Sequence, residues 1–301
     1  MGVHAARFLA VGVFIGLLFP PVAALLKPLL APAVALLLSV AMVRIDWSQV
    51  LIHGRRLRLS LSVLLWLTVI SPVVTWVICR AIDLPPAFTT ALVLMAAAPP
   101  VTSSIAIALI SRLDAALVLL GTLSATLIVP LTLPPLSLEL LGLPIELSVL
   151  ELSGRLALMV GSALAGSLII RRLLGKEGLA RHAEALDGVT VVLMLTFGIA
   201  IMDGVTNAAF ADPLFVIYCV AISFIANIGL QLIGAASFFW LGWRGAISMA
   251  LPSGNRNMGL LLSVLGSTAA PESALYFAIG QLPIYMLPAI LAPIYRRAAQ
   301  R

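Results

Sequence analysis

LPSGNRN, residues 251–257, lies in the middle of an apolar run that extends from about Gly245 to Ser267. Proline removes a backbone donor and glycine tolerates irregular backbone angles, so this stretch is predicted to break a membrane-spanning helix. At membrane depth a break is tolerated only where the freed backbone is buried in protein or lines a watery cavity. Arg256 lies near the centre of the run, too deep for its side chain to reach an interface easily. It is therefore a candidate functional residue, and the alternative is a simple kink.

The composition is typical of a protein that crosses a membrane several times. Of the 301 residues, 62% are hydrophobic and only 10% are charged, against roughly 25% in soluble domains. Much of the surface is therefore expected to face membrane lipid. The net charge of +6 does not indicate nucleic acid, because the basic residues lie in short flanks between apolar runs. Cys79, Cys219 and the scattered histidines show no metal-ligand or disulfide spacing, so no metal centre and no cofactor is expected.

The apolar runs predict ten membrane-spanning helices, since a span needs about 20 predominantly apolar residues. Between them we expect a short amphipathic piece at 46–53 and a proline-spotted loop on the membrane at 136–149. The predicted spans are residues 7–26, 28–45, 57–82, 87–111, 114–134, 151–170, 185–202, 213–241, 245–267 and 273–295.

The charged residues orient these spans. Most of the basic residues fall on one side of the predicted membrane, together with both ends of the sequence, and most of the acidic residues fall on the other. This asymmetry follows the positive-inside rule. It predicts an even number of spans in the cell (inner) membrane, with the N- and C-termini in the cytoplasm.

The fourth and ninth spans are the only ones predicted to have a polar, proline-broken centre. Pro99 and Pro252 mark these centres and occupy corresponding places in the two halves of the chain. Each half contains five spans, an odd number, so the second half is inverted relative to the first. We therefore expect two inverted repeats, 1–150 and 151–301. Paired broken spans at corresponding positions indicate a transporter's binding site near the middle of the membrane.

Polar side chains cluster at the first break. Thr102, Ser103 and Ser104 follow the prolines, where a restarting helix would present unpaired amides that favour an anion. The alternative is that their hydroxyls bond back to carbonyls of their own helix.

Further polar residues lie inside other spans. Asn227 and Gln231 share one helix face at i, i+4, and so do Thr122 and Thr126. Gln281 lies in the tenth span. For the amides, lining a cavity and joining helices are equally good interpretations. Enzyme chemistry is not expected, because no histidine, carboxylate pair or phosphate-binding loop lies within a span.

The whole ten-span layout resembles the bile acid:sodium symporter family. That family has a Pro-Gly-Gly-Thr-Ala-Ser-Asn type motif in the fourth span, where this chain has PPVTSSI at 99–105. Its ninth span has Glu-Val-Gly-Met-Gln-Asn-Ser-Gly, where this chain has PSGNRNMG at 252–259. The fifth span is also similar, with Asp114, Thr122, Thr126 and Pro130 at matching spacing.

The resemblance implies a panel domain and a core domain, each built from both repeats. It also implies that the two broken helices cross in the core beside an organic-anion substrate. In the family, sodium is held by the ninth-span glutamate and glutamine, by the fourth-span Ser-Asn pair and by fifth-span hydroxyls. Ser104, Thr122 and Thr126 keep hydroxyls at these positions, whereas the other ligand positions hold Pro252, Arg256 and Ile105.

These replacements remove the anionic sodium ligand and introduce a fixed cation. A hard cation needs oxygen ligands, and a guanidinium stays protonated, so Arg256 opposes sodium binding. The hypothesis is that Arg256 takes the place of the sodium charge, and either holds the crossing together or contacts an anionic substrate.

The predicted function is thus a secondary transporter or facilitator for small organic anions that does not depend on the usual sodium sites. Its substrate-binding candidates are Thr102, Ser103, Ser104, Asn227, Asn255, Arg256, Asn257 and Gln281, and its ion-site vestige is Ser104, Thr122, Thr126, Pro252 and Arg256. One alternative is a sodium-coupled symporter with a shifted site that adds Asn255 and Asn257. Others are an auxin-efflux-carrier type of layout, and a non-transporting sensor or scaffold.

Overall fold

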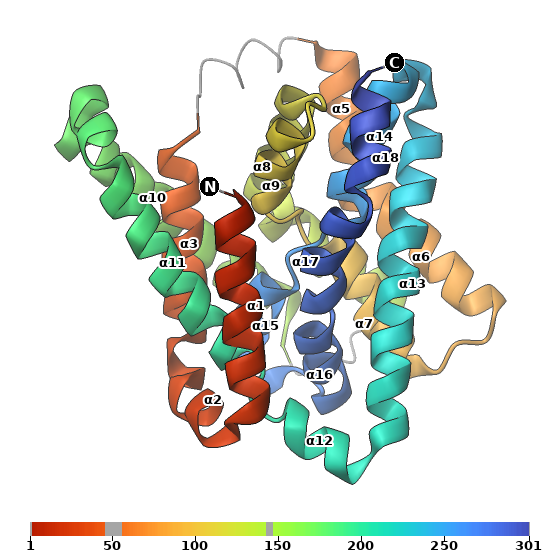
Figure 1. The fold of residues 1–301 in the computed structure, drawn as a ribbon. Coiled ribbons are helices and arrows are strands. Elements are labelled where there is room, and N and C mark those ends of the chain that lie inside the picture. The colour runs from red at the N-terminus through yellow and green to blue at the C-terminus, as the bar shows by residue number, and fades with distance from the viewer. Residues whose placement is uncertain (1, 46–55, 143–146, 301) are drawn as a thin grey trace. The chain divides into compact units, whose positions relative to one another are not determined.

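The computed structural model describes residues 2–45, 56–142 and 147–300. Over these ranges the chain is helical and contains no strand (Figure 1). Seven helical runs are long and apolar enough to cross a membrane by length and composition, which confirms the prediction of an all-α, multi-pass membrane protein. The amphipathic piece predicted at 46–53 lies outside the described residues. The seven runs are Pro20–Val43, Leu57–Ala81, Ala115–Leu141, Val149–Gly175, Ala183–Ala211, Pro213–Ser237 and Pro271–Ile290.

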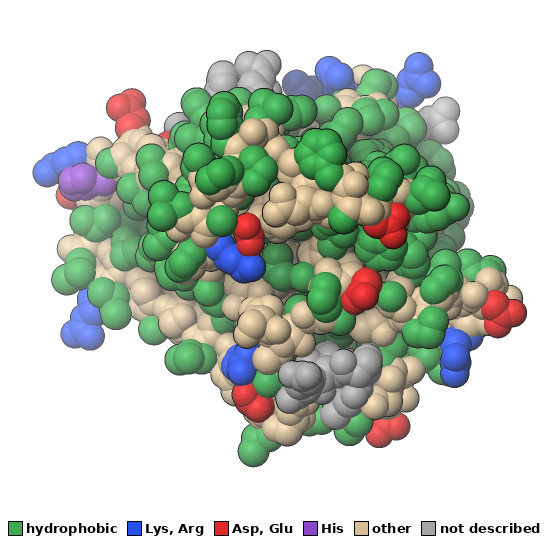
Figure 2. All heavy atoms as spheres, turned by 90° about the horizontal axis from the view of Figure 1, so that it is seen from below, with side chains coloured by type: hydrophobic (Ala, Val, Ile, Leu, Met, Phe, Trp, Pro, Cys, Tyr) green, Lys and Arg blue, Asp and Glu red, His purple; other side chains and the backbone are tan. Residues whose placement is uncertain are grey.

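The surface of these helices is strongly apolar. Large side chains such as Leu25, Leu158 and Phe210 are 76%, 74% and 86% exposed. In Figure 2 hydrophobic side chains cover much of the visible face, and charged side chains are few and scattered. Such a surface is disfavoured in water and suited to lipid.

The chain divides into two compact units, and each is built from both halves of the sequence. Unit 1 comprises Met1–Ile45 and Arg155–Val216, and unit 2 comprises Asp46–Gly154 and Ile217–Arg301. Two of the unit boundaries fall within helices, one in α10 (Val149–Arg181) and the other in α13 (Pro213–Ser237).

Unit 1 contains a close helix pair. The helices α1 (Gly2–Leu18) and α11 (Ala183–Ala200) run alongside each other (Figure 1). A Cβ atom added to Gly12 or Gly16 of α1 would lie 2.8 Å from the Leu195 carbonyl oxygen or 2.6 Å from that of Ile199, both in α11. Only glycine allows this approach, as is usual where small residues recur every four positions in membrane helices. The helices of unit 1 are α1 (Gly2–Leu18), α2 (Pro20–Leu26), η1 (Lys27–Leu29), α3 (Leu30–Val43), α10 (Val149–Arg181, interrupted at Gly175), α11 (Ala183–Ala200) and α12 (Val205–Ala211).

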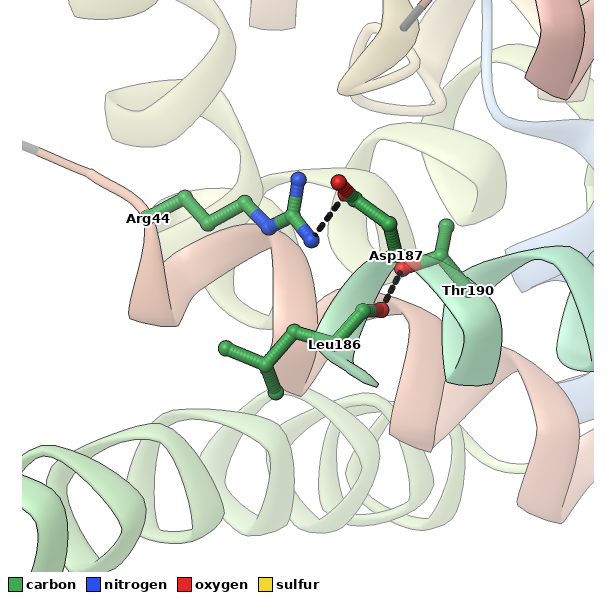
Figure 3. Close-up of polar contacts among 4 residues, drawn as sticks. All are labelled: Arg44, Leu186, Asp187 and Thr190. Carbon is green, nitrogen blue, oxygen red and sulfur yellow. Dashed lines mark hydrogen bonds and ion pairs between the residues drawn. The ribbon is translucent and has the colours of Figure 1, made fainter. Parts of the chain in front are cut away.

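Ion pairs join α11 and the residues after it to the first helices of unit 1. Arg44 pairs with Asp187, one residue after Leu186, whose carbonyl accepts from the Thr190 hydroxyl (Figure 3). Lys27 Nζ lies 2.8 Å from Asp203 Oδ2. Each of these aspartates thus has a basic partner in the structure. Because these side chains are partly exposed, each pair is expected to contribute little stability.

Unit 2 contains the two helices that are interrupted in mid-course. Its elements are α5 (Leu57–Leu65), η2 (Trp66–Ile70, a π-helical turn), α6 (Ser71–Ala81), α7 (Pro86–Ala97), α8 (Ser103–Ile110), α9 (Ala115–Leu141), α13 (Pro213–Ser237, from Ile217 on), η3 (Phe239–Leu241), α14 (Gly242–Gly254), α15 (Met258–Leu265), η4 (Gly266–Thr268), α16 (Pro271–Ile279), α17 (Gln281–Ile290) and α18 (Ala292–Ala299).

The predicted first span, 7–26, has the wrong boundary. Helix α1 ends at Leu18, and a new helix begins at Pro20. Phe19 has φ −125° and ψ 72°, outside the helical region. The cause is steric, since a residue that precedes proline is pushed out of the α conformation. Pro20 and Pro21 then occupy the first turn of α2, where their missing donors cause no loss.

The surface loop predicted at 136–149 is also wrong in its first part. Helix α9 continues through Pro130, Pro134 and Pro135 as far as Leu141. The Ser137 hydroxyl donates to the carbonyl of Pro134 at 2.8 Å. The helix ends instead at Gly142, whose φ of 67° is the left-handed conformation typical of a helix C-cap. Prolines alone therefore do not end this helix.

Candidate functional site at the helix breaks

The two interrupted helices meet at their interruptions. Helix α7 ends at Ala97 and α8 begins at Ser103, while α14 ends at Gly254 and α15 begins at Met258. The Val101 amide donates to the carbonyl of Asn255 at 2.9 Å, and the Asn257 amide donates to that of Pro99 at 2.8 Å. These bonds form an antiparallel bridge between Pro100 and Arg256. Each non-helical segment thus supplies backbone partners to the other, which a buried break in lipid requires.

The positions of the breaks follow from local chemistry. Pro99 and Pro100 lack backbone donors, and Ala98 is extended, with φ −63° and ψ 148°. In the second interruption the helix continues through Pro252 to Gly254, so the break lies one turn later than the proline. Asn257 then begins α15, because its side-chain oxygen accepts from the Leu260 amide at 3.0 Å.

Arg256 lies fully buried at this bridge, with 0% of its surface exposed. Every nitrogen of its guanidinium donates a hydrogen bond. Nε donates to the Ser253 carbonyl at 2.8 Å, and Nη1 donates to the carbonyls of Leu67 and Ala98 at 2.8 Å and 3.0 Å. Nη2 donates to the Ser71 hydroxyl at 2.7 Å. The side chain therefore links η2 and α6 to both helix breaks.

The carbonyls that Arg256 contacts are those that helix geometry leaves without partners. In η2 the Ser71 amide bonds to Trp66, one residue earlier than in an α-helix. The Leu67 carbonyl would then need the amide of Pro72, which proline lacks. The carbonyls of Ala98 and Ser253 lie at the ends of α7 and α14, where helices run out of internal donors. The guanidinium fork satisfies all three.

The charge of Arg256 is surrounded by oxygen atoms that carry no formal charge. No aspartate or glutamate among the described residues forms an ion pair with it. Carbonyl and hydroxyl oxygens are also the ligands that a hard cation takes in proteins. The guanidinium of Arg256, a cation fixed to the chain, is therefore surrounded by oxygen atoms of the kind that also coordinate a free metal cation.

A second set of side chains forms a chain of hydrogen bonds that ends at the same bridge. The Tyr295 hydroxyl donates to Gln231 Oε1 at 2.8 Å, and Gln231 Nε2 donates to Asn227 Oδ1 at 2.7 Å. Asn227 Nδ2 donates to the Gly254 carbonyl at 3.0 Å and to Asn255 Oδ1 at 3.1 Å. The predicted residues Asn227 and Asn255 thus lie together with Gln231.

Close packing holds these hydrogen-bonded side chains against α14. A Cβ atom on Gly254 would lie 2.5 Å from the Asn227 carbonyl and 2.5 Å from Gln231 Cγ. On the next turn of α13, a Cβ atom on Gly234 would lie 2.2 Å from Ser253 Oγ, which accepts from Trp66 Nε1 at 2.8 Å. Helices α13 and α14 therefore touch nearly backbone to backbone.

Four buried polar atoms on α8, α9 and the second break have no hydrogen-bond partner within the described residues. Ser104 and Thr122 are 0% and 1% exposed. An unpaired buried polar atom is costly and calls for an explanation, such as a ligand or water. The atoms are Ser103 Oγ, Ser104 Oγ, Thr122 Oγ1 and Asn255 Nδ2.

Within the described residues, the side chains of the other predicted site residues make no hydrogen bond with another helix that would mark a binding site. The Thr126 hydroxyl donates to the Thr122 carbonyl at 2.7 Å, four residues back in its own helix. Gln281 Nε2 donates to the Phe277 carbonyl at 3.1 Å, four residues back. Pro252 is buried inside α14 and has no side-chain oxygen or nitrogen to offer. Thr102 is the N-cap residue of α8, and its side chain makes no cap hydrogen bond.

Sequence reasoning missed the partners of Arg256. Ser71 and the Leu67 carbonyl lie in the third predicted span, which reads as an ordinary apolar helix apart from Ser71-Pro72. That dipeptide was the available signal, because proline always frees a carbonyl on the preceding turn. It points to Thr68 in an α-helix, and only the π-helical turn moves the free carbonyl to Leu67. Tyr295, near the predicted end of the tenth span, gave no signal of its own.

In comparisons with known proteins, no family model matches the chain, and no curated protein matches it.

Proposed function

We propose that this chain is a secondary transporter for small organic anions, with its substrate site at the meeting of α7–α8 with α14–α15. The observation that carries the proposal is the antiparallel bridge between Pro100 and Arg256. Two helices interrupted at corresponding places, whose breaks satisfy each other, are the arrangement in which discontinuous membrane helices present their termini to a substrate.

The full layout that we propose has ten spans in two inverted repeats, 1–150 and 151–301. In addition to the seven long runs, α1, α7–α8 and α14–α15 then cross the membrane. The division of the chain supports this layout, because each compact unit combines a piece of the first half with a piece of the second. Unit 2, which contains both interrupted helices, then corresponds to a core domain, and unit 1 to a panel domain. Alternating access comes from movement of one relative to the other.

We propose that Arg256 takes the place of a bound sodium ion, as a structural cation. Its contacts with Leu67, Ala98 and Ser253 support this role rather than substrate contact, since they engage every guanidinium nitrogen. A second cation within a few ångströms would be repelled by several kcal/mol at an effective dielectric constant of about 20. Transport is then independent of sodium, no cofactor is required, and the chain is no enzyme.

The likeness to the bile acid:sodium symporter family remains part of this proposal, and so does an inner-membrane location with both termini in the cytoplasm. The substrate class that we propose is organic anions, with steroids, keto acids, vitamin precursors and small carboxylates as the candidates. The anion preference is supported by the start of α8, where, among the described residues, no hydrogen bond is found from the amides of Thr102 and Ser103 and the backbone dipole favours negative charge.

One observation favours the sodium-coupled alternative. The hydroxyls of Ser104 and Thr122 lack partners among the described residues, and hydroxyl oxygens are acceptable sodium ligands. Against it, the segment that leads into Ser104 is bridged at Pro100 to Arg256, which carries a fixed positive charge. Among the described residues no carboxylate forms an ion pair with Arg256.

Uptake into proteoliposomes tests the proposal. We expect carboxylate uptake above that of empty liposomes, at the same rate with a sodium gradient as with an N-methylglucamine gradient. A strong sodium requirement would sink the structural-cation role of Arg256 and support the coupled alternative. Binding without any uptake would instead support the sensor or scaffold.

A further inference from the structure

We propose that the side-chain amide of Asn255 is a donor-only anchor for the carboxylate of the substrate. The inference rests on the proposed function and names the group at that site that recognises the ligand. It comes from the orientation of one buried carboxamide, which its neighbours fix.

The orientation begins with a group that can only accept. The Gly254 carbonyl accepts from Asn227 at 3.0 Å, so the atom of Asn227 that faces it must be Nδ2. The same Nδ2 lies 3.1 Å from the side chain of Asn255, which must therefore turn its oxygen toward Asn227. A flipped Asn255 would set two donors against each other.

The hydrogen bonds that run from Tyr295 through Gln231 and Asn227 to Asn255 form a relay, and its other end agrees with this assignment. With Asn227 Nδ2 turned to Gly254, its Oδ1 faces Gln231 and accepts from Nε2 at 2.7 Å. Gln231 then presents Oε1 to the hydroxyl of Tyr295, which donates to it at 2.8 Å. Each amide is thus held in one orientation by the next.

Asn255 Nδ2 consequently points away from the relay with both hydrogens and no acceptor. Asn255 is 0% exposed, and Nδ2 has no hydrogen-bond partner among the described residues. Leaving a buried donor unpaired costs about 1–3 kcal/mol. A ligand that accepts from it recovers that energy, so the protein gains affinity from a group already desolvated and fixed in place.

The surroundings of Asn255 favour an anion. The Val101 amide donates to the Asn255 carbonyl, which holds Asn255 beside the start of α8. No hydrogen bond from the backbone amides of Thr102 or Ser103 is found over the described ranges, so the start of α8 offers further donors. Arg256, which directly follows Asn255 in the sequence, adds positive charge. Donors, a helix N-terminus and a cation all disfavour a second cation and favour a carboxylate.

Asn255→Asp is the sharpest test, because it replaces the free NH₂ group by an oxygen of nearly the same size. The aspartate can still accept from Asn227, so the relay is kept. Asn255→Leu removes the donor without adding charge and serves if the aspartate variant does not fold. Asn207→Asp, at an exposed position in α12 of unit 1, is the matched control. The thermal melting profile of each purified variant reports folding.

Binding is measured by calorimetry with the N-methylglucamine salts of pyruvate, hexanoate and cholate on the detergent-solubilised full chain. We expect at least one acid to bind the wild type and N207D equally, and to bind N255D or N255L about 30-fold or more weakly. Equal binding by the folded Asn255 variants would overturn the anchor, and so would a wild type that binds none of the three acids.

Uptake measured in parallel separates this inference from the proposed function. Loss of binding in N255D beside a wild type that binds without transporting would retain the anchor and refute the transporter. Uptake by N255D at the wild-type rate and affinity would retain the transporter and refute the anchor.

Discussion

The carbonyl of Leu67 accepts a hydrogen bond from Arg256 Nη1 at 2.8 Å, although the two residues lie 189 positions apart in the sequence. The bond joins the π-helical turn η2 to the non-helical residues between α14 and α15. The Leu67 carbonyl lacks a helix donor, because Pro72 has no backbone N–H. The Arg256 guanidinium forms no ion pair with a carboxylate of the described residues and donates to this carbonyl instead. The hydrogen bonds of Arg256 thus give it a structural role, whether or not it also contacts a ligand.

Replacing Arg256 by methionine is expected to lower the free energy of unfolding by about 2–5 kcal/mol, because the buried carbonyls of Leu67, Ala98 and Ser253 lose their donor. The melting temperature in detergent measures the loss. Arg80→Met, at an exposed position near the end of α6, makes the same chemical change and should have little effect. Equal stability of the R256M variant and the wild type would contradict the role of Arg256 as a cap for these carbonyls.

Ser71→Ala removes the acceptor of Arg256 Nη2 and the donor to the Ala96 carbonyl, at 2.7 Å and 3.2 Å. We expect a loss of about 1–2 kcal/mol in stability. In the R256M background the same change should have a smaller effect, because the shared bond is already gone. The double-mutant cycle reports this coupling, and strictly additive effects would show that the bond contributes nothing measurable.

Gly254→Ala is expected to destabilise unit 2 by about 1–3 kcal/mol, since its methyl group would lie 2.5 Å from both the Asn227 carbonyl and Gln231 Cγ. Gly229→Ala is the control on α13, because a Cβ atom there meets nothing within 4 Å. The melting temperatures of the G254A and G229A variants measure this difference in stability. A G254A variant no less stable than G229A would mean that α13 and α14 pack less closely than the structure shows.

In unit 1, Gly16→Leu should separate α1 from α11, because a Cβ atom at Gly16 would lie 2.6 Å from the Ile199 carbonyl. Gly161→Leu in α10 provides the matched control, since nothing lies within 4 Å of its Cβ position. We expect G16L to reduce the yield of folded protein in fluorescence-detected size exclusion and G161L to leave it unchanged. Similar elution profiles for the two variants would count against the close helix pair.

The double substitution Pro252→Glu with Arg256→Gln restores, by resemblance, the glutamate and glutamine of the sodium symporters. It removes the fixed cation and supplies an anionic oxygen ligand. We expect sodium at about 100-fold its Kd to stabilise this variant by about 2.7 kcal/mol, and potassium to have little effect. Wild type should melt at the same temperature in either salt. A wild type that sodium stabilises would refute the replacement of sodium by Arg256.

Helices α7 and α14 end at Ala97 and Gly254, close to the prolines from which broken spans are predicted, because the effect of proline on a helix is local. Pro99, Pro100 and Pro252 lack a backbone N–H in any structure. An arginine in the middle of an apolar run is costly to desolvate, so it can be recognised from the sequence as a candidate functional residue. The same reasoning identified Asn227, Asn255 and Arg256 as polar residues worth attention. It did not reveal which group each would contact.

The rest could not be predicted because it depends on which distant groups are neighbours. No feature of the nearby sequence distinguishes Pro130, which lies inside α9, from Pro20, which is the first residue of α2. The free carbonyl at Leu67 depends on a one-residue change in helix register. The unpaired donor on Asn255 depends on a relay that starts at Tyr295 in another helix. Each of these outcomes is decided by tertiary partners, against or beyond the local preference.

The division of the two units has a consequence for biosynthesis. Met1–Ile45 leaves the ribosome long before Arg155–Val216, and the Leu67 and Ala98 carbonyls enter the membrane long before Arg256 is translated. A nascent chain arrested near residue 150 would therefore hold both units half-built, with helix carbonyls unpaired in the lipid. The last third of the polypeptide, which contains Arg256, thus supplies hydrogen-bond donors to backbone carbonyls in the first third.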